Sequence, residues 1–268
     1  MKVISSVRVA SLKSIFKKPK YKVAVVIPVY KAVLNDHEKS SLNRCFEVLH
    51  AHPIIFITPK SFNIQEIDLP TDKPIVKYFS DKFFADINSY NQLMLSTDFY
   101  NSFLDYKYIL IYQLDSFVFS DQLLYWCGLS YDYIGAPWRK NMLPFLYQVP
   151  FWARHDKLRR LFGMSRFVGN GGFSLRKVKS FLLALHLMER KALEFRSNED
   201  IFWSLLVPSY IPFFLIPQVD TALKFSFEMN PREYFKKNGD ELPFGCHAWA
   251  RYDIEFWRPI FENYGYTI

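Results

Sequence analysis

The segment YILIYQLD, residues 108–115, decides the fold of this chain. Five apolar residues in a row predict a strand buried on both faces, and the polar triplet marks its end. Similar buried runs occur at 22–30 (KVAVVIPVY) and 53–58 (PIIFIT). Helical patterns lie between these three runs, over 38–50 and 87–104. This alternation predicts a doubly wound α/β fold, with a mostly parallel central sheet flanked by helices.

The rest of the chain is less regular but fits one domain. Further strands are expected over 76–79, 131–138, 167–175 and 222–227, and further helices over 177–194 and 199–206. A length of 268 residues is near the upper end for a single hydrophobic core. We therefore expect an N-terminal extension over 1–21 and a single domain over 22–268, with a basic, aromatic insertion at 139–166.

The basic charge is concentrated in two segments. The chain has a formal net charge of +8. Residues 1–22 hold seven Lys or Arg and no acid, and residues 139–166 hold seven more against one acid. Basic residues mixed with apolar ones favour an anionic membrane surface over nucleic acid, because no nucleic-acid-binding motif accompanies them. Solvated segments without a partner remain the alternative, and no nucleic acid is expected.

The cysteines and the apolar runs bear on location. Cys45, Cys127 and Cys246 are far apart, odd in number and without a C-x-x-C pair, which argues against a disulfide framework or a zinc ribbon. No apolar run approaches the ~20 residues that span a bilayer. Arg8 and Lys13 interrupt the apolar character of the N-terminus, so no signal peptide is predicted. A cytoplasmic protein, peripheral at the inner face of the membrane, is expected.

Asp115 is the first candidate for chemistry. Tyr30, Thr58 and Asp115 each lie at the carboxyl end of a predicted strand, which is where α/β sheets bind ligands. An ionised carboxylate beside a buried strand must be paired, hydrogen-bonded or bound to a metal. A divalent cation on a diphosphate would satisfy Asp115, and a turn at the strand end is the alternative.

Three later motifs add further candidates. Asn170, Gly171 and Gly172 belong to a glycine-rich block that permits close backbone approach to a ligand, or else a tight hairpin. Glu199-Asp200 opens a predicted helix, where acids either interact with the helix dipole or serve as a general base. His247 follows a glycine, and it becomes a metal-ligand candidate when it is combined with Asp115.

Six blocks of the sequence together resemble a family of bacterial GT-A-like glycosyltransferases associated with capsule and O-antigen biosynthesis. The blocks are IPVYK (27–31), YILIYQLDSFVF (108–119), YDYIGAPW (131–138), VGNGGFSLRK (168–177), NEDIFW (198–203) and PFGCHAW (243–249). The resemblance covers roughly residues 22–257. It implies a GT-A, Rossmann-like fold and transfer of a sugar from a nucleoside-diphosphate sugar, a UDP-sugar here, to a glycan or lipid-linked glycan acceptor in cell-surface polysaccharide synthesis.

The resemblance also implies roles for individual residues. GT-A enzymes hold Mn²⁺ or Mg²⁺ on the diphosphate with a D-x-D motif, which Gln113-Leu114-Asp115 matches only at its second acid. His247 matches a late metal ligand of such enzymes, and Asp200, with Glu199 beside it, matches the catalytic acid pair of inverting members. The donor-binding residues implied are Pro28, Val29, Tyr30, Lys31, Gln113, Asp115, Asn170, Gly171 and Gly172.

Two other functions fit parts of the pattern. A nucleotidyltransferase also combines an α/β sheet with acids and a metal, but it needs an early glycine-rich phosphate loop, and residues 27–31 contain no glycine. A non-catalytic protein that binds glycans or membranes would use only the aromatic and basic residues. Metal-dependent nucleotide binding distinguishes that protein from the transferase.

Overall fold

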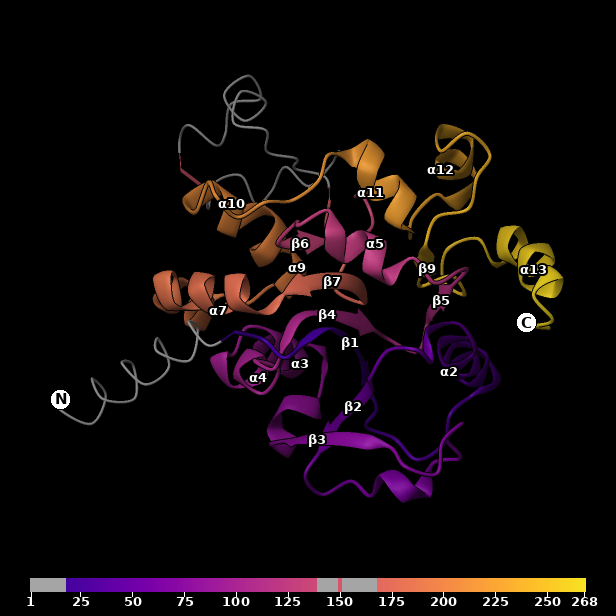
Figure 1. Ribbon diagram of the computed structural model, residues 1–268, viewed down its shortest axis with the longest axis horizontal. Coiled ribbons are helices and arrows are strands. Elements are labelled where there is room, and N and C mark those ends of the chain that lie inside the picture. Colours follow the sequence, from indigo (N-terminus) through magenta and orange to yellow (C-terminus); the bar gives the residue numbers. More distant parts are fainter. Residues whose placement is uncertain (1–17, 139–148, 151–167) are drawn as a thin grey trace.

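The computed structural model describes residues 18–138, 149–150 and 168–268. The main strands are β1 Tyr21–Pro28, β2 Ile54–Pro59, β3 Ile75–Phe79, β4 Tyr106–Tyr112, β6 Tyr133–Ile134 and β7 Phe173–Lys177. They form one sheet in the order β3-β2-β1-β4-β7-β6 (Figure 1). The first four are parallel, whereas β7 runs antiparallel to both β4 and β6. The predicted α/β class with a mostly parallel, mixed sheet is confirmed.

Helices cover both faces of this sheet. Among the described residues, the α-helices are α2 Asp36–Leu49, α3 Ile87–Met94, α4 Thr97–Asn101, α5 Leu123–Gly128, α7 Val178–Leu187, α8 Glu189–Glu194, α9 Glu199–Ile201, α10 Val207–Tyr210, α11 Val219–Phe225, α12 Pro231–Lys237 and α13 Ile254–Asn263. The short 3-10 helices are η1 Ile64–Glu66 and η2 Asp81–Phe84, and η5 Phe202–Leu206 is a π-helix.

Side chains alternate between two covered faces along residues 23–28 of β1, which explains why this part of the strand is apolar throughout. Ala24 and Val26 belong to a core that includes residues of α3, α4 and α7. Val23 and Val25 belong to the core on the other face, with residues of α2 and α5. Because both faces of the strand are covered, its burial requires a continuous apolar run instead of alternating polar residues.

A second, smaller sheet lies beside the first. It contains β5 Ser116–Val118, β9 Gly245–His247 and β8 Ser226–Phe227, in the order β5-β9-β8. Phe117 packs within an aromatic cluster that includes Trp257 and Phe261 of α13. Figure 1 shows α13 next to β5, at the side of the molecule opposite α7. The C-terminal segment thereby anchors the strand that follows β4.

Some expected elements differ in the structure. Residues 222–227, expected as a strand, are mostly the end of α11, and only Ser226–Phe227 pairs as β8. Ala222, Leu223 and Phe225 are buried at helical spacing, and a short apolar run does not distinguish helix from strand. The helix expected over 87–104 is two helices, because Ser96 caps a new one.

Two sequence expectations concern residues outside the described ranges. The basic extension lies almost entirely in residues 1–17, and the basic insertion almost entirely in 139–148 and 151–167. None of the helices among the described residues has the length and apolar character needed to cross a bilayer.

Candidate functional site

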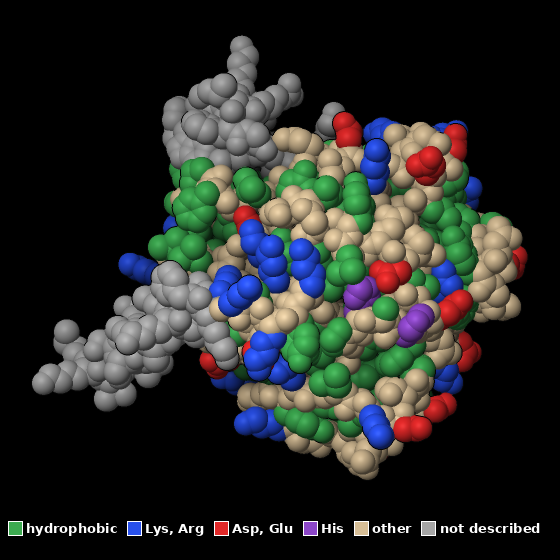
Figure 2. All heavy atoms as spheres, viewed as in Figure 1, with side chains coloured by type: hydrophobic (Ala, Val, Ile, Leu, Met, Phe, Trp, Pro, Cys, Tyr) green, Lys and Arg blue, Asp and Glu red, His purple; other side chains and the backbone are tan. Residues whose placement is uncertain are grey.

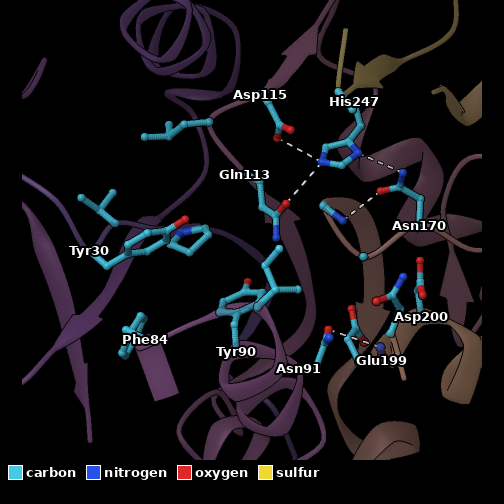
Figure 3. A pocket seen from close by; sticks show the side chains of 18 of the residues that line it. Tyr30, Phe84, Tyr90, Asn91, Gln113, Asp115, Asn170, Glu199, Asp200 and His247 are labelled. Carbon is cyan, nitrogen blue, oxygen red and sulfur yellow. Dashed lines mark hydrogen bonds and ion pairs between the residues drawn. The ribbon is translucent and has the colours of Figure 1, made fainter. Parts of the chain in front are cut away.

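A cavity of about 650 Å³ lies at the carboxyl ends of β1 and β4. Because these two strands are parallel, their carboxyl ends share one edge of the sheet, the usual place for a ligand in an α/β fold. Every site residue expected from the sequence lines this cavity: Pro28, Val29, Tyr30, Lys31, Gln113, Asp115, Asn170, Gly171, Gly172, Glu199, Asp200 and His247. Figure 3 labels Tyr30, Gln113, Asp115, Asn170, Glu199, Asp200 and His247 among them, whose side chains come from several elements.

Sheet pairing brings the glycine-rich block to the end of β4. Since β7 is antiparallel to β4, the residues before β7 lie at the same edge as those after β4. The backbone N–H of Gln113 donates to the Gly172 carbonyl oxygen at 2.8 Å. The Asn170 side-chain oxygen accepts from the backbone N–H groups of Gly172 at 2.8 Å and Phe173 at 3.1 Å. These bonds hold the block in place.

The small sheet brings His247 beside Asp115. In the β5–β9 pair, Ser116 lies opposite His247. His247 Nε2 is 3.0 Å from Asp115 Oδ1 and 3.3 Å from Gln113 Oε1 (Figure 3). Three potential metal-binding atoms, from one imidazole and two oxygen groups, therefore converge.

The second nitrogen of the His247 ring also has close neighbours. Nδ1 lies 3.0 Å from the Asn170 amide nitrogen and 3.4 Å from Glu228 Oε1. Burial disfavours the imidazolium, but the Asp115 and Glu228 carboxylates outweigh burial and raise the pKa of His247 to about 10. For Asp115, burial alone would raise the pKa of the carboxyl, yet His247 lowers it below its usual value.

Close contacts require glycine at positions 171 and 172. A Cβ on Gly172 would lie 1.9 Å from His247 Nε2, and one on Gly171 would lie 2.3 Å from Glu199 Oε1. Neither distance is compatible with a side chain. The glycines of this block therefore give the histidine and the carboxylate room beside the backbone.

Glu199 is held in a buried ion pair. Its two carboxylate oxygens accept from Arg176 Nη2 at 2.7 Å and Nη1 at 3.1 Å. The side chains of Arg176 and Glu199 are 0% and 4% exposed. The remaining Arg176 donors bind the Ser174 and Tyr100 hydroxyls and the Gly171 carbonyl oxygen. This arrangement anchors the start of α9 to β7.

Asp200 has a different environment from its neighbour. Its carboxylate accepts from the backbone N–H of Ile201 at 2.8 Å and lines the cavity. Burial, followed by the negative charges of Glu199 and Glu228, raises the pKa of Asp200 from 3.8 to about 7. A carboxyl group with a pKa near neutrality can take up a proton at physiological pH.

Aromatic side chains border the cavity near the end of β1. The Tyr30 ring is 56% exposed, and its centroid lies 6.2 Å from that of Phe84. Lys31 Nζ forms an ion pair with Glu38 at 2.7 Å. Glu38 also completes the capping box of α2 with Asn35, so this rim is tied to a helix start.

Some cavity residues were not predicted from the sequence. Glu228 follows the two-residue strand β8 in a segment without a recognisable pattern. Asn91 lies on the buried face of α3. A polar residue at a position expected to be apolar is a sign of a site residue that can be detected in the sequence. Arg176 lies in the VGNGGFSLRK block (168–177), for which the resemblance implies no role at this position. Its position on a buried strand implies a buried anionic partner.

Asp115, Gln113 and His247 are the residues at the β4 end that could hold a divalent metal. The described residues hold no group of three or more His, Cys, Asp and Glu side chains able to bind a metal ion. The amide oxygen of Gln113 supplies the third atom beside Asp115 and His247. The carboxylate and amide oxygens are of the kind that Mg²⁺ and Mn²⁺ prefer, and Gly172 leaves the space in which His247 lies.

Three solved structures show similarity to this chain. WbbM, a bifunctional glycosyltransferase in its apo form, has a TM-score of 0.49 and 14% identity, covering 86% of this chain and 46% of WbbM, so the chain spans less than half of that protein. The galactosyltransferase LgtC, in complex with donor and acceptor sugar analogues, has a TM-score of 0.46 and 13% identity, covering 84% of this chain and 86% of LgtC. A glycosyltransferase involved in glycosylation of the major capsid of PBCV-1 has a TM-score of 0.44 and 9% identity, covering 84% of this chain and 92% of that protein's chain.

Comparison with curated proteins gives no match. The profile of the family described as "Protein of unknown function (DUF5672)" matches residues 74–247, from β3 to the end of β9. The matched region contains Asp115, the glycine-rich block, the Glu199-Asp200 pair and His247. Because the match spans more than half of the 268 residues, the chain belongs to the DUF5672 family.

Proposed function

We propose that this chain is an inverting glycosyltransferase. It would transfer a sugar from a UDP-sugar to a hydroxyl group of a glycan or lipid-linked glycan. The observation that carries this proposal is the meeting, in one cavity, of the Asp115–His247 pair and Asp200, a carboxyl with a pKa near 7. Such a transfer needs a site for a diphosphate and a base for an incoming hydroxyl. The cavity volume also falls in the range of small-ligand sites.

Asp115, His247 and Gln113 are the residues that would hold Mn²⁺ or Mg²⁺. When bound, the metal would neutralise charge on the departing diphosphate. Asn170 and Glu228 contact the His247 ring and would keep it oriented. Pro28, Val29, Tyr30 and Lys31 border the cavity beside β1, where the nucleoside would lie.

Asp200 would act as the general base. As the acceptor hydroxyl oxygen forms a bond to the anomeric carbon, its proton would pass to the Asp200 carboxylate. The bond from the anomeric carbon to the diphosphate oxygen would break, leaving UDP. Attack from the face opposite the leaving group inverts the anomeric centre. Glu199 is already bound by Arg176, so its role would be to position α9.

The cellular setting is part of the proposal. The basic residues of 1–22 and 139–166 would bring the enzyme to the anionic inner face of the cell membrane, where lipid-linked acceptors are found. The product would enter cell-surface polysaccharide. The resemblance noted above supports this pathway.

The direct test is UDP release from a panel of UDP-sugars with Mn²⁺, followed by product analysis on glycan acceptors. The expected result is metal-dependent UDP release that Asp200→Asn slows at least about 10²-fold. Calorimetry of UDP with and without Mn²⁺ separates this function from a non-catalytic glycan-binding protein, which would show no metal-dependent nucleotide binding. Release of pyrophosphate from a nucleoside triphosphate would indicate a nucleotidyltransferase instead.

A further inference from the structure

Asn91 carries a buried polar group that the fold does not satisfy. Its side chain lies on α3, lines the cavity and is only 7% exposed. The side-chain oxygen accepts from the backbone N–H of Glu199 at 3.3 Å. The side-chain nitrogen is buried and has no hydrogen-bond partner within the part of the chain that the structure describes. Such groups are rare because an unmet donor in the interior is destabilising.

The bond to Glu199 determines which way the Asn91 amide faces. With its oxygen committed to the start of α9, the nitrogen is the end left for a ligand (Figure 3). The donor is thus held on a helix and oriented by a second element before any ligand binds. This is the arrangement expected of a preorganised binding residue.

The surrounding charges indicate which ligand group this donor receives. Glu199 and Asp200 begin the neighbouring helix, and Asp200 would be ionised when it acts as a base. Arg176 directs its donors to Glu199, Ser174, Tyr100 and Gly171, so its charge is already compensated. An anionic ligand group would be repelled at this position, whereas a neutral hydroxyl oxygen can accept from the amide.

We infer that Asn91 binds a hydroxyl group of the transferred sugar and selects a neutral sugar over a uronic acid. This inference rests on the proposed function. The donor sugar is the part of the substrates enclosed between the diphosphate and the base, which agrees with the nearly complete burial of Asn91. An acceptor glycan must extend into solvent and fits this position less well.

The test compares wild type with Asn91→Ala on UDP-glucose, UDP-galactose and the monodeoxy analogues of each. In wild type, loss of one particular hydroxyl should lower kcat/KM at least about tenfold, since the amide is then left unpaired. In Asn91→Ala the same deoxy donor should differ from its parent by no more than about threefold. UDP affinity should be unchanged. UDP-glucuronate should be at least about tenfold poorer than UDP-glucose.

Two further variants separate this role from a loss of structure. Asn88→Ala changes the same residue type at an exposed position of α3. It should leave the kcat/KM ratio of each parent donor to its deoxy analogue at the wild-type value. Asn91→Leu keeps the size of the buried side chain but has no donor, so it should lose sugar discrimination while retaining UDP binding.

Several outcomes would overturn the inference. One is an Asn91→Ala variant that discriminates deoxy donors as wild type does. Another is an Asn91→Ala variant that loses discrimination of deoxy acceptors instead of deoxy donors, which would place the acceptor beside Asn91. Efficient use of UDP-glucuronate would refute the selection for a neutral sugar. Absence of UDP release from any donor by wild type would instead refute the proposed function, and this inference with it.

Discussion

The Glu199 carboxylate is held by both terminal nitrogens of Arg176, at 2.7 and 3.1 Å, in an interior almost closed to solvent. Its neighbour in sequence, Asp200, lines the cavity with a pKa raised to about 7. Two adjacent acids at the start of one helix therefore have different properties. Arg176 binds both carboxylate oxygens of Glu199, whereas burial and the neighbouring acids raise the pKa of Asp200.

Replacing Asp200 should separate catalysis from folding. We expect Asp200→Asn to lower the transfer rate at least about 10²-fold, because the amide cannot accept the acceptor proton. UDP affinity should stay near the wild-type value, and the melting temperature should not fall. Steady-state kinetics, calorimetry and thermal denaturation check these three quantities.

The matched variant is Glu199→Gln. It leaves the buried charge of Arg176 without a carboxylate, so the free energy of unfolding should drop by about 3 kcal/mol. The turnover of the molecules that remain folded should suffer less than in Asp200→Asn. If Glu199→Gln loses turnover at unchanged stability while Asp200→Asn stays active, Glu199 is the base. If neither variant loses turnover, the pair is structural.

The pH dependence follows from the raised pKa of Asp200. Below about pH 7 the carboxyl is protonated and cannot act as a base, so kcat/KM should rise with pH and level off above that value. The unfolded chain ionises Asp200 near 3.8, so between 3.8 and about 7 the folded state binds more protons, and its stability contribution falls as pH rises.

Asp200→Asn removes this dependence. Relative to wild type, the variant should therefore gain stability between pH 5 and pH 8, which denaturant titrations at the two values would show. A kcat/KM profile without an inflection between pH 6 and pH 8 would count against Asp200 as the base.

The Asp115–His247 pair should govern metal-dependent nucleotide binding. We expect Asp115→Asn and His247→Ala each to weaken UDP binding with Mn²⁺ at least about tenfold, or 1.4 kcal/mol. Calorimetry with and without Mn²⁺ provides the measurement. Asp121→Asn, which changes an acid paired with His52 outside the cavity, serves as the control. Wild-type affinity in both cavity variants would make the metal assignment wrong.

Gly172 offers a test of the same site without removing a functional group. In Gly172→Ala, the new Cβ would fall 1.9 Å from His247 Nε2, so the ring must move away from Asp115. Mn²⁺-dependent UDP binding should weaken about tenfold or more. Gly128→Ala is the matched control, because nothing lies within 4 Å of its Cβ position. Equal UDP affinity in the two variants would mean that the position of His247 does not matter for binding.

The basic N-terminus should contribute to membrane binding. Deleting residues 1–17 leaves β1 intact, since that strand begins at Tyr21. The deletion should reduce binding to anionic liposomes, and higher salt should have the same effect on the full chain because it screens the lysines. Sedimentation with phosphatidylserine vesicles measures this, with phosphatidylcholine vesicles as the control. Unchanged sedimentation after deletion would remove this segment from the proposal.

Local sequence was sufficient for the central parallel strands β1, β2 and β4. Each central strand is covered on both faces, so its burial appears directly as an apolar run, and the polar residues that follow mark its carboxyl end. This is why Tyr30 and Asp115 could be placed at one edge before any contact was known. The close packing of Gly171 and Gly172 was likewise suggested by residue type alone.

Pairing between distant segments required the tertiary structure. The β5–β9 ladder that brings His247 to Asp115 is three residues long, too short to leave a periodic pattern. The same holds for Glu228, which follows a two-residue strand.

The sequence by itself determined the central parallel strands β1, β2 and β4, their ligand-binding edge and the residue types available there. Only the tertiary structure decided that Arg176 neutralises Glu199, that Asp200 faces the cavity with a raised pKa, and that the Asn91 nitrogen has no partner among the described residues. The physical reason is that burial and hydrogen bonding depend on neighbours in space, whereas periodicity reports only the face on which a side chain lies.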